Sequence, residues 1–461
     1  MNLVETPSAE SIPLRPLNSD TLAPWLELQP ETVKRWITAT GFKADAGKTC
    51  LVPGSDGAIR EVLVGIGDAS EGMWDFAALP KALPARAFHL DAELSAERAN
   101  GAALGWALGT YRFDRHEKKD AKQRAVLAWP SGCDRPRVES AARATFLVRD
   151  LVNAPASDMG PAELAESARA TAEDHGGAVR IVVGDELIEL GFPAIHAVGR
   201  AASPDRAPRL IDFSWGEPSS PKVTLVGKGV CFDTGGLDLK PSAHMKLMKK
   251  DMGGGAHVLG LARMIMSAKL PVRLRVLIPA VENSVSASSL RPLDVVPTRK
   301  GTTIEIGNTD AEGRVILADA LTEASSETPE LIIDFATLTG AARIALGAEL
   351  PALYSNDDKT AAELLAHGER ESDPLWRMPL FKPYRSLIDS KVADLTNATE
   401  SPLGGSITAA LFLQEFLEPE IPWIHIDVMA WNTRSRPGRP EGGEAMGMRA
   451  VYALIEERFC R

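Results

Sequence analysis

The sequence predicts an α/β fold with two domains, each a mixed or mostly parallel sheet flanked by helices, with the catalytic site in the C-terminal domain. Three observations lead to this fold class. The chain has 461 residues, more than one ordinary hydrophobic core needs. Apolar, strand-like runs alternate with helical patterns along its C-terminal part. Carboxylate-bearing motifs follow those runs, at the strand ends where open α/β sheets bind their ligands.

The composition is that of a globular protein. Hydrophobic residues make up 44% and charged residues 25%, and the formal net charge of -11 makes a nucleic-acid partner unlikely to be the main one. Four scattered cysteines form no CxxC pair, so neither a disulfide framework nor a structural zinc site is expected. The first thirty residues contain no signal-peptide core, and no apolar run reaches the roughly 18 residues that cross a bilayer. We therefore expect a cytoplasmic protein without a membrane partner.

Residues 1–136 are predicted to form an N-terminal α/β domain that carries no catalytic motif. The expected strands lie at 50–53, 61–65 and 125–129, and the expected helices at 75–83 and 94–108. Residues 137–152 have apolar side chains at helical spacing and end at Asn153-Ala154-Pro155, a helix stop signal. They are predicted to be a linker helix.

Residues 153–461 are predicted to form the C-terminal catalytic domain. The expected strands are 179–183, 223–226, 272–280, 331–336 and 423–428. The expected helices are 161–175, 254–267, 315–326, 407–416 and 448–458. Near-continuous apolar strands that alternate with helices indicate a sheet covered on both faces.

The heptapeptide Asn308–Arg314 places two carboxylates two residues apart, between apolar runs. In an extended or turn conformation, Asp310 and Glu312 lie on the same side of the backbone. Two buried carboxylates would repel each other unless one took up a proton or a divalent cation bound between them. An acidic turn that caps the helix beginning at Val315 explains the heptapeptide alone equally well.

A Gly-rich segment upstream favours the metal site over the helix cap. Asp233 and Asp251 lie in loops whose glycines permit close backbone approach. With Asp310 and Glu312 they supply four negative charges, which suit two divalent ions about 3.5–4 Å apart. Oxygen ligands favour Mn²⁺ or Mg²⁺, and Zn²⁺ remains open. The nearest histidines, His244 and His257, are expected to be packed or surface residues.

Lys228 and Lys240 flank Asp233 in this segment. A single lysine is usually a solvated surface charge. A buried lysine can instead lose its proton and act as a ligand or base. One that stays charged can stabilise a developing oxyanion. The residues therefore indicate metal-assisted hydrolysis, without naming the bond that is cleaved.

At these residues the sequence resembles the cytosolic leucine aminopeptidases, a family of dinuclear-metal enzymes that form hexamers. The matching stretches are 226–236, 248–254, 308–314, 336–340, 376–380 and 425–427. The likeness covers about residues 150–461, and the heptapeptide is its most specific part. Residues 445–450 depart from the usual pattern near the side-chain pocket, and the N-terminal region contributes almost nothing.

The resemblance implies a role for each matching residue. The implied metal ligands are Lys228, Asp233, Asp251, Asp310 and Glu312. The implied substrate-binding residues are Met248, Leu338, Gly340 and Met446. Asp233 and Glu312 would bridge the metals, Lys228 and Asp251 would complete the tight site, and Asp310 would complete the exchangeable one. Lys240 would polarise the scissile carbonyl, and Arg314 would hold a bicarbonate ion that acts as general base.

The resemblance also implies the activity: release of N-terminal amino acids, leucine and other apolar residues preferred, from peptides. Its cofactors would be two divalent ions per subunit, Mn²⁺ or Zn²⁺ with Mg²⁺ as a further alternative, and bicarbonate as the base. A homo-oligomer, namely a hexamer, is expected. A related hypothesis narrows the substrates to dipeptides. Two others keep the fold without the main activity: a DNA-binding or recombination-accessory protein, and a catalytically silent structural hexamer.

Overall fold

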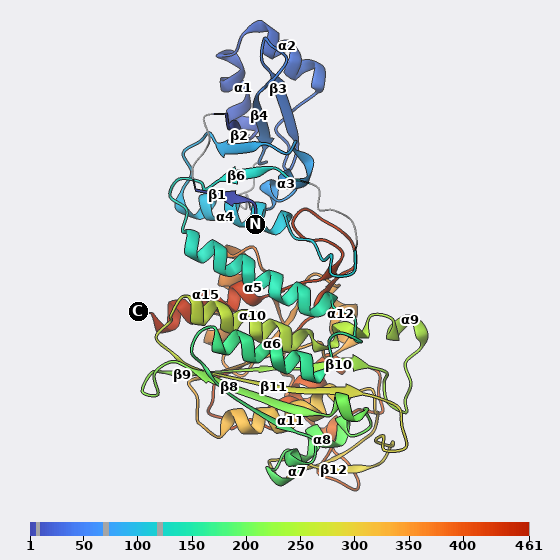
Figure 1. Cartoon of the computed structure of the whole chain (residues 1–461). Helices are drawn as coiled ribbons and strands as arrows, with labels where there is room; N and C mark the ends of the chain where they lie inside the picture. Colours follow the sequence, from blue (N-terminus) through green and yellow to red (C-terminus); the bar gives the residue numbers. More distant parts are fainter. Residues whose placement is uncertain (6–9, 68–72, 118–122, 461) are drawn as a thin grey trace. The chain divides into compact units, whose positions relative to one another are not determined.

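The computed structural model describes residues 1–5, 10–67, 73–117 and 123–460 (Figure 1). It divides into two compact units, Met1–Phe146 with Arg434–Glu441, and Leu147–Thr433 with Gly442–Arg461. Both units contain sheets flanked by helices, which confirms the predicted α/β class. No helix within the described ranges is long and apolar enough to cross a bilayer.

The first unit is built on a six-stranded sheet with the order β1-β6-β5-β2-β4-β3. All its neighbouring strands are parallel except β3 and β4. The strands are β1 (Leu3–Val4), β2 (Ile12–Leu17), β3 (Thr49–Pro53), β4 (Ile59–Gly65), β5 (Ala87–Leu90) and β6 (Val126–Ala128). The helices are α1 (Ser19–Glu27), α2 (Glu31–Thr40), η1 (Trp74–Phe76), α3 (Leu79–Ala82) and α4 (Ala96–Gly109).

Strand β2 lies inside this sheet although the sequence did not indicate it. It pairs with β4 on one side and β5 on the other. Pro13 and Pro16 each remove one backbone donor, which is why the segment does not resemble an interior strand. Leu14 nevertheless packs into the core with Phe88 and Trp106, all fully buried.

One segment from late in the chain belongs to the first unit. In Arg434–Glu441, the guanidinium of Arg439 lies 3.7 Å from the ring centroid of Trp74. The domain boundaries expected from the sequence place residues 434–441 in the C-terminal domain instead. The helix expected at 137–152 is α5 (Arg135–Asn153).

The second unit contains a nine-stranded mixed sheet with the order β16-β15-β18-β14-β9-β11-β8-β7, and β10 pairs with β11. Its strands are β7 (Ala178–Val183), β8 (Arg209–Trp215), β9 (Lys222–Gly227), β10 (Gly229–Asp233), β11 (Arg273–Asn283), β14 (Leu331–Ala336), β15 (Ala352–Ser355), β16 (Trp376–Arg377) and β18 (Trp423–Asp427). The centre, from β18 to β11, is parallel, while β8, β7 and β15 pair in antiparallel fashion. The smaller sheets contain β12 (Val295–Pro297), β13 (Thr303–Glu305), β17 (Leu395–Thr396), β19 (Trp431–Asn432) and β20 (Gly442–Gly443).

Helices cover both faces of the large sheet, as expected for buried parallel strands. Figure 1 shows α6 and α10 on one side of the strands, and α11 and α8 on the other. The helices are α6 (Pro161–Glu173), α7 (Glu186–Glu189), α8 (Pro193–Gly199), α9 (Ser242–Met245), α10 (Gly253–Ser267), α11 (Glu312–Ser325), α12 (Gly340–Leu346), α13 (Asp358–Arg370), α14 (Gly405–Gln414) and α15 (Met448–Phe459). Short 3₁₀ helices are η2 (Pro204–Arg206), η3 (Met248–Met252) and η4 (Lys382–Ile388).

The start of α10 approaches the carboxyl end of the central strands very closely. A Cβ added to Gly254 would lie 2.0 Å from the carbonyl oxygen of Phe335 and 2.8 Å from the amide nitrogen of Lys228. Because no side chain fits there, glycine is required for α10 to dock against β9 and β14. That docking brings η3, which carries Asp251, beside the segment that carries Lys228.

A buried ion pair within the second unit ties α5 to the C-terminal segment. Arg149 Nε donates to Glu444 Oε1 and Nη2 donates to Oε2, each at 3.0 Å, and both side chains are buried. Asn432 Nδ2 and the amide of Ala445 also donate to the Glu444 carboxylate, at 2.7 and 3.0 Å. The carboxylate is therefore held by donors from three segments.

We expect Arg149→Met to lower the free energy of unfolding by about 3–5 kcal/mol, because it leaves a buried carboxylate without its cation. Glu444→Gln added to Arg149→Met should recover a large part of that loss, since a neutral amide keeps an acceptor for the remaining donors. Urea denaturation followed by tryptophan fluorescence measures both. Equal stability of the single and double variants would contradict this account.

Candidate active site

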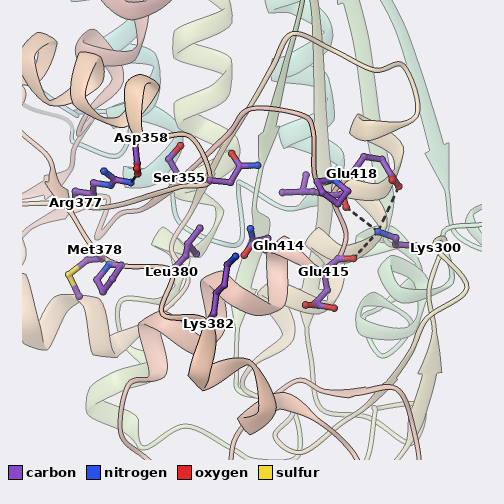
Figure 2. A pocket seen from close by; sticks show the side chains of 14 residues that line it. Lys300, Ser355, Asp358, Arg377, Met378, Leu380, Lys382, Gln414, Glu415 and Glu418 are labelled. Carbon is purple, nitrogen blue, oxygen red and sulfur yellow. Dashed lines mark hydrogen bonds and ion pairs between the residues drawn. The ribbon is translucent and has the colours of Figure 1, made fainter.

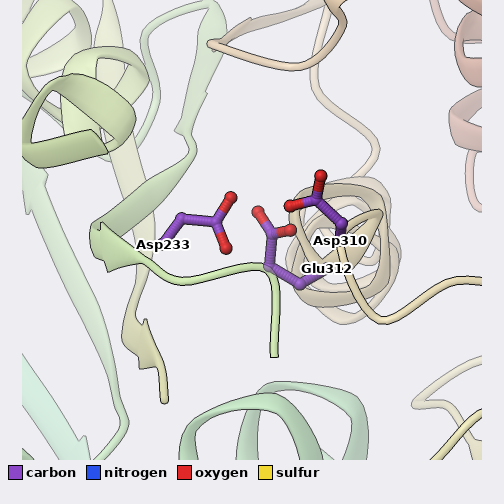
Figure 3. A group of neighbouring side chains, drawn as sticks. All are labelled: Asp233, Asp310 and Glu312. Atoms are coloured by element: carbon purple, nitrogen blue, oxygen red, sulfur yellow. The ribbon is translucent and has the colours of Figure 1, made fainter. Parts of the chain in front are cut away.

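Three carboxylates converge at the carboxyl edge of the large sheet. One oxygen each of Asp233, Asp310 and Glu312 lies within 4.8 Å of the others (Figure 3). Asp233 is the last residue of β10, and Glu312 is the first residue of α11. The predicted convergence of the two motifs is therefore observed, and it arises because a strand end and a helix start meet at one edge.

Lys228 lies beneath this cluster, directly after β9. Its Nζ is 2.8 Å from Asp251 Oδ2 and 2.9 Å from Glu312 Oε1, and it donates to the carbonyl of Thr337 at 2.9 Å. Burial alone would lower the pKa of Lys228, but the carboxylates of Asp251 and Glu312 outweigh it and raise that pKa. Without bound metal, Lys228 is thus an ammonium that bridges two carboxylates.

Lys240 lies on the other side of the cluster and is only slightly exposed. Its Nζ is 2.8 Å from Asp233 Oδ2 and also pairs with Asp310. Burial alone would lower the pKa of Lys240, while Asp233 and Glu312 raise it. This lysine therefore presents a fixed positive charge beside the carboxylates.

Neutral side chains that sequence reasoning missed orient the carboxylates. Asn283, the last residue of β11, donates from Nδ2 to Asp233 Oδ1 at 2.9 Å and to the carbonyl of Thr309 at 3.1 Å. Thr337 Oγ1 donates to Asp251 Oδ1 at 2.8 Å. Their position at strand ends next to the motifs was a signal that could have found them.

The cluster carries more negative charge than its own lysines neutralise. Burial and the neighbouring Asp233 raise the pKa of Glu312 to about 8 and that of Asp310 to about 6, against the opposing effect of the lysines. Glu312 Oε2 is buried without a hydrogen-bond partner in the described part of the chain. Buried carboxylates left with this surplus fit divalent cations, which accept oxygen ligands and relieve the repulsion.

The cluster opens into a cavity of about 370 Å³. Of the predicted site residues, the cavity wall includes Lys228, Asp233, Lys240, Met248, Asp251, Asp310, Leu338 and Gly340. Glu312 does not line the cavity, but it contacts the other residues of the cluster. The structure therefore brings nine of the eleven predicted residues together at one place.

Arg314 and Met446 do not line the cavity. Arg314 is buried in α11, two residues after Glu312, and burial lowers its pKa to about 10. Met446 is buried, and its amide donates to His257 Nε2 at 2.9 Å. His257 is thus a packed residue, as expected, while His244 is an exposed residue of the cavity rim.

Asp427, at the end of β18, lines the cavity and holds the neighbouring part of its wall in place. Its carboxylate accepts from the amides of Leu338 and Thr339 at 3.0 and 3.3 Å and from Thr339 Oγ1 at 2.6 Å. It fixes the backbone that carries two of the predicted substrate-binding positions.

A larger cavity, of about 1140 Å³, lies elsewhere in the second unit (Figure 2). Its charged groups are largely engaged with their own surroundings. Arg377 pairs with Asp358, and Lys300 donates to the carbonyls of Glu415 and Leu417 at 2.9 and 3.1 Å. The acidic cluster is not among its lining residues, so we place the chemistry in the smaller cavity.

Two family models match the chain. Residues 146–452 match the cytosol aminopeptidase family, catalytic domain, and residues 12–130 match the M17 aminopeptidase, N-terminal domain. A protein of Syntrophotalea carbinolica named "Probable cytosol aminopeptidase" is 41% identical over 372 residues, 77% of this chain and 74% of the relative. A protein of Rhodococcus jostii with the same name is 37% identical over 453 residues, 91% and 88% of the two chains.

Solved structures agree with these matches. The cytosol aminopeptidase from Coxiella burnetii superimposes with a TM-score of 0.95 and 51% identity, covering 99% of each chain. The bottromycin maturation enzyme BotP in complex with Mn superimposes with a TM-score of 0.88 and 35% identity, covering 98% of this chain and 100% of BotP. The match of residues 12–130 shows that the N-terminal region is also related to this family, which its sequence motifs did not indicate. Because the catalytic model spans most of the chain and the fold agrees from end to end, the chain belongs to the cytosol aminopeptidase family of metallo-exopeptidases.

Proposed function

We propose that this chain releases N-terminal amino acids, preferably leucine and other apolar residues, from peptides by two-metal activation of water. The observation that carries the proposal is the buried cluster of carboxylates and lysines that opens into a cavity at the sheet edge. When bound, two divalent ions would lower the pKa of a water molecule and polarise the scissile carbonyl. The free α-amine of the substrate would bind at the same centre, which restricts cleavage to the first residue.

In this proposal, Asp233 and Glu312 together with Lys228, Asp251 and Asp310 would hold the two ions. The Lys228 contacts support this arrangement, because its Nζ already touches two of the other ligands. Against the effect of burial, the carboxylates of Asp251, Glu312 and Asp233 raise the pKa of Lys228. Two nearby divalent ions would reverse that balance and favour the neutral amine that a ligand requires.

Lys240 and Arg314 are proposed to act on the reacting groups. Lys240 would stabilise the developing oxyanion, because its ammonium is held at the cluster by two carboxylates and faces the cavity. Arg314 would hold bicarbonate as general base. Its buried Nε has no hydrogen-bond partner among the described residues, so an anion there would satisfy it.

The proposed preference for apolar first residues has two sources of support. Met248 and Leu338 contribute apolar surface to the cavity, and methionine adapts to differently shaped side chains. Met446 belongs to segment 445–450, which departs from the family pattern. It does not line the cavity, so we propose that it supports the cavity wall and does not contact the substrate.

The native ions are proposed to be Mn²⁺ or Zn²⁺, with Mg²⁺ as a further possibility; the Mn complex of BotP supports the first. A hexamer is proposed from the resemblance to the family, and exposed apolar side chains outside the active-site cavity, such as Leu403 at 75%, support contact with another copy of the chain. The relatives named as cytosol aminopeptidases support a cytoplasmic location. Nothing among the described residues favours the DNA-binding alternative over this reading.

Chelator-treated protein should not cleave leucine p-nitroanilide, and Mn²⁺ or Zn²⁺ should restore cleavage. Glu312→Ala should abolish restored activity because it removes a proposed metal ligand. Lys240→Ala should lower kcat about 10²–10³-fold, the usual effect of losing an oxyanion donor. Steady-state kinetics with each metal provide the measurement.

Lys382→Ala is the matched control, because this exposed lysine lines the larger cavity instead (Figure 2). It should keep the wild-type rate. Folded wild-type protein that binds ions yet turns over no peptide or anilide with any metal would refute the proposed activity.

Asn283→Leu should weaken metal binding about 10- to 100-fold, since it frees the Asp233 carboxylate from its orienting donor. Competition against a chromogenic chelator measures this affinity. Asn356→Leu is the matched control, because Asn356 lies outside the cluster. Its Nδ2 donates to the carbonyl of Ile421, its Oδ1 accepts from the amide of Trp423, and the substitution removes both hydrogen bonds. It should reduce stability and leave metal affinity unchanged; an equal loss of affinity in both variants would show that Asn283 acts only through the fold.

A further inference from the structure

Lys250 is a buried lysine on the wall of the active-site cavity, and the proposed chemistry does not use it. It lies in η3, next to Asp251, and only 5% of its surface is exposed. No hydrogen bond or ion pair to its Nζ is found among the residues that the structure describes. Because Lys250 lines the cavity and its Nζ has no partner among those residues, this amine is available to a ligand that enters the cavity.

The neighbouring lysines are all engaged, which makes Lys250 distinct. Lys228 and Lys240 contact the carboxylate cluster. Lys249 donates to the carbonyl of Asn153 at 2.6 Å. Burial lowers the pKa of Lys250 to about 8, with Asp251 and Asp427 raising it and the cations Lys228 and Arg343 lowering it. A lysine amine donates hydrogen bonds whether or not it is protonated, so its capacity as a donor does not depend on that value.

Arg343 adds a second cationic group to the same wall. It lies in α12, one turn after Gly340, and a Cβ added to Gly340 would be 3.8 Å from Arg343 Nη2. The guanidinium therefore lies over one of the proposed substrate-binding positions. Its recorded contact is a weak one, from Nη1 to Met429 Sδ at 3.8 Å, and no ion pair is found within the described ranges.

The acidic side chains of the cavity do not neutralise this wall. Asp233, Asp251 and Asp310 are engaged by Lys228 and Lys240 at the proposed metal centre. The carboxylate of Asp427 accepts three hydrogen bonds from Leu338 and Thr339. Lys250 and the exposed Arg343, which make no ion pair in the described part of the chain, thus present donors to a cavity whose carboxylates are already engaged.

We propose that Lys250 and Arg343 form a carboxylate-binding wall, which raises kcat/KM for substrates bearing a carboxylate close to the scissile bond in addition to the apolar first residues that the proposed function favours. The inference rests on the proposed aminopeptidase function and adds a substrate class to it. The carboxylate belongs either to the side chain of an N-terminal glutamate or aspartate, or to the free C-terminus of a dipeptide. In both cases the same two donors supply charge-assisted hydrogen bonds.

Two substrate pairs separate these sources in the metal-loaded enzyme. Glutamyl and leucyl p-nitroanilide differ in a side-chain carboxylate. The dipeptide Leu-Gly and its C-terminal amide differ in a terminal carboxylate. The ratio of kcat/KM within each pair is measured for the wild type, Lys250→Met, Arg343→Met and Lys250→Arg. Lys246→Met is the matched control, because it removes an exposed lysine that does not line the cavity.

In one pair, Lys250→Met and Arg343→Met should each lower kcat/KM for the carboxylate-bearing member about 10- to 100-fold, the range of one charge-assisted hydrogen bond. The neutral member should stay within about twofold. Lys250→Arg should retain most of the preference, and Lys246→Met all of it. The pair that responds identifies which carboxylate is bound.

Equal losses on both members of each pair would overturn the proposal, because they would place Lys250 in support of Asp251 instead. No change in either pair would overturn it as well. Cleavage of leucyl p-nitroanilide by the wild type tests the aminopeptidase function separately. If nothing is cleaved, calorimetric binding of the same four compounds decides: weaker binding of a carboxylate-bearing compound alone in Lys250→Met supports the wall, and unchanged binding rejects it.

Discussion

The second unit is organised around the cost of burying carboxylates next to one another. Asp233, Asp251 and Glu312 are buried and Asp310 is half-buried, so water screens their mutual repulsion only weakly. Lys228 and Lys240 offset part of the charge, and the raised pKa of Glu312 reflects burial together with the repulsion from Asp233 that remains. A fold that holds this surplus in place must be rigid behind it, which explains the parallel strands, the close approach at Gly254 and the orienting amide of Asn283.

The sequence predicted the chemical part of the site better than its support. The motifs at 226–236 and 308–314 identified residues whose type and spacing suit metal binding, and the structure brings them together. Asn283 and Asp427 are single polar residues at strand ends, so no spacing marked their roles. Lys250 is likewise ordinary in sequence; only its burial without a partner distinguishes it from Lys249.

The fold could be predicted where hydrophobic periodicity is strong and not where another constraint overrides it. The apolar runs of β9, β11, β14 and β18 correspond to the predicted strands, because interior parallel strands are buried on both faces. Strand β2 was hidden by its two prolines. The antiparallel strands β8 and β15, each next to an edge strand of the sheet, were also missed, since they do not fit a simple strand–helix alternation.

The excursion at Arg434–Glu441 has a consequence for biosynthesis. The first unit includes residues from near both ends of the chain, so its final piece leaves the ribosome only after almost all of the second unit. The unit cannot reach its complete packing, including the contact of Arg439 with Trp74, before most of the second unit has been synthesised. Vectorial folding, in which an N-terminal domain is finished before the next one begins, is therefore closed to this protein. A fragment that ends before residue 434 would carry a first unit that lacks part of its own structure.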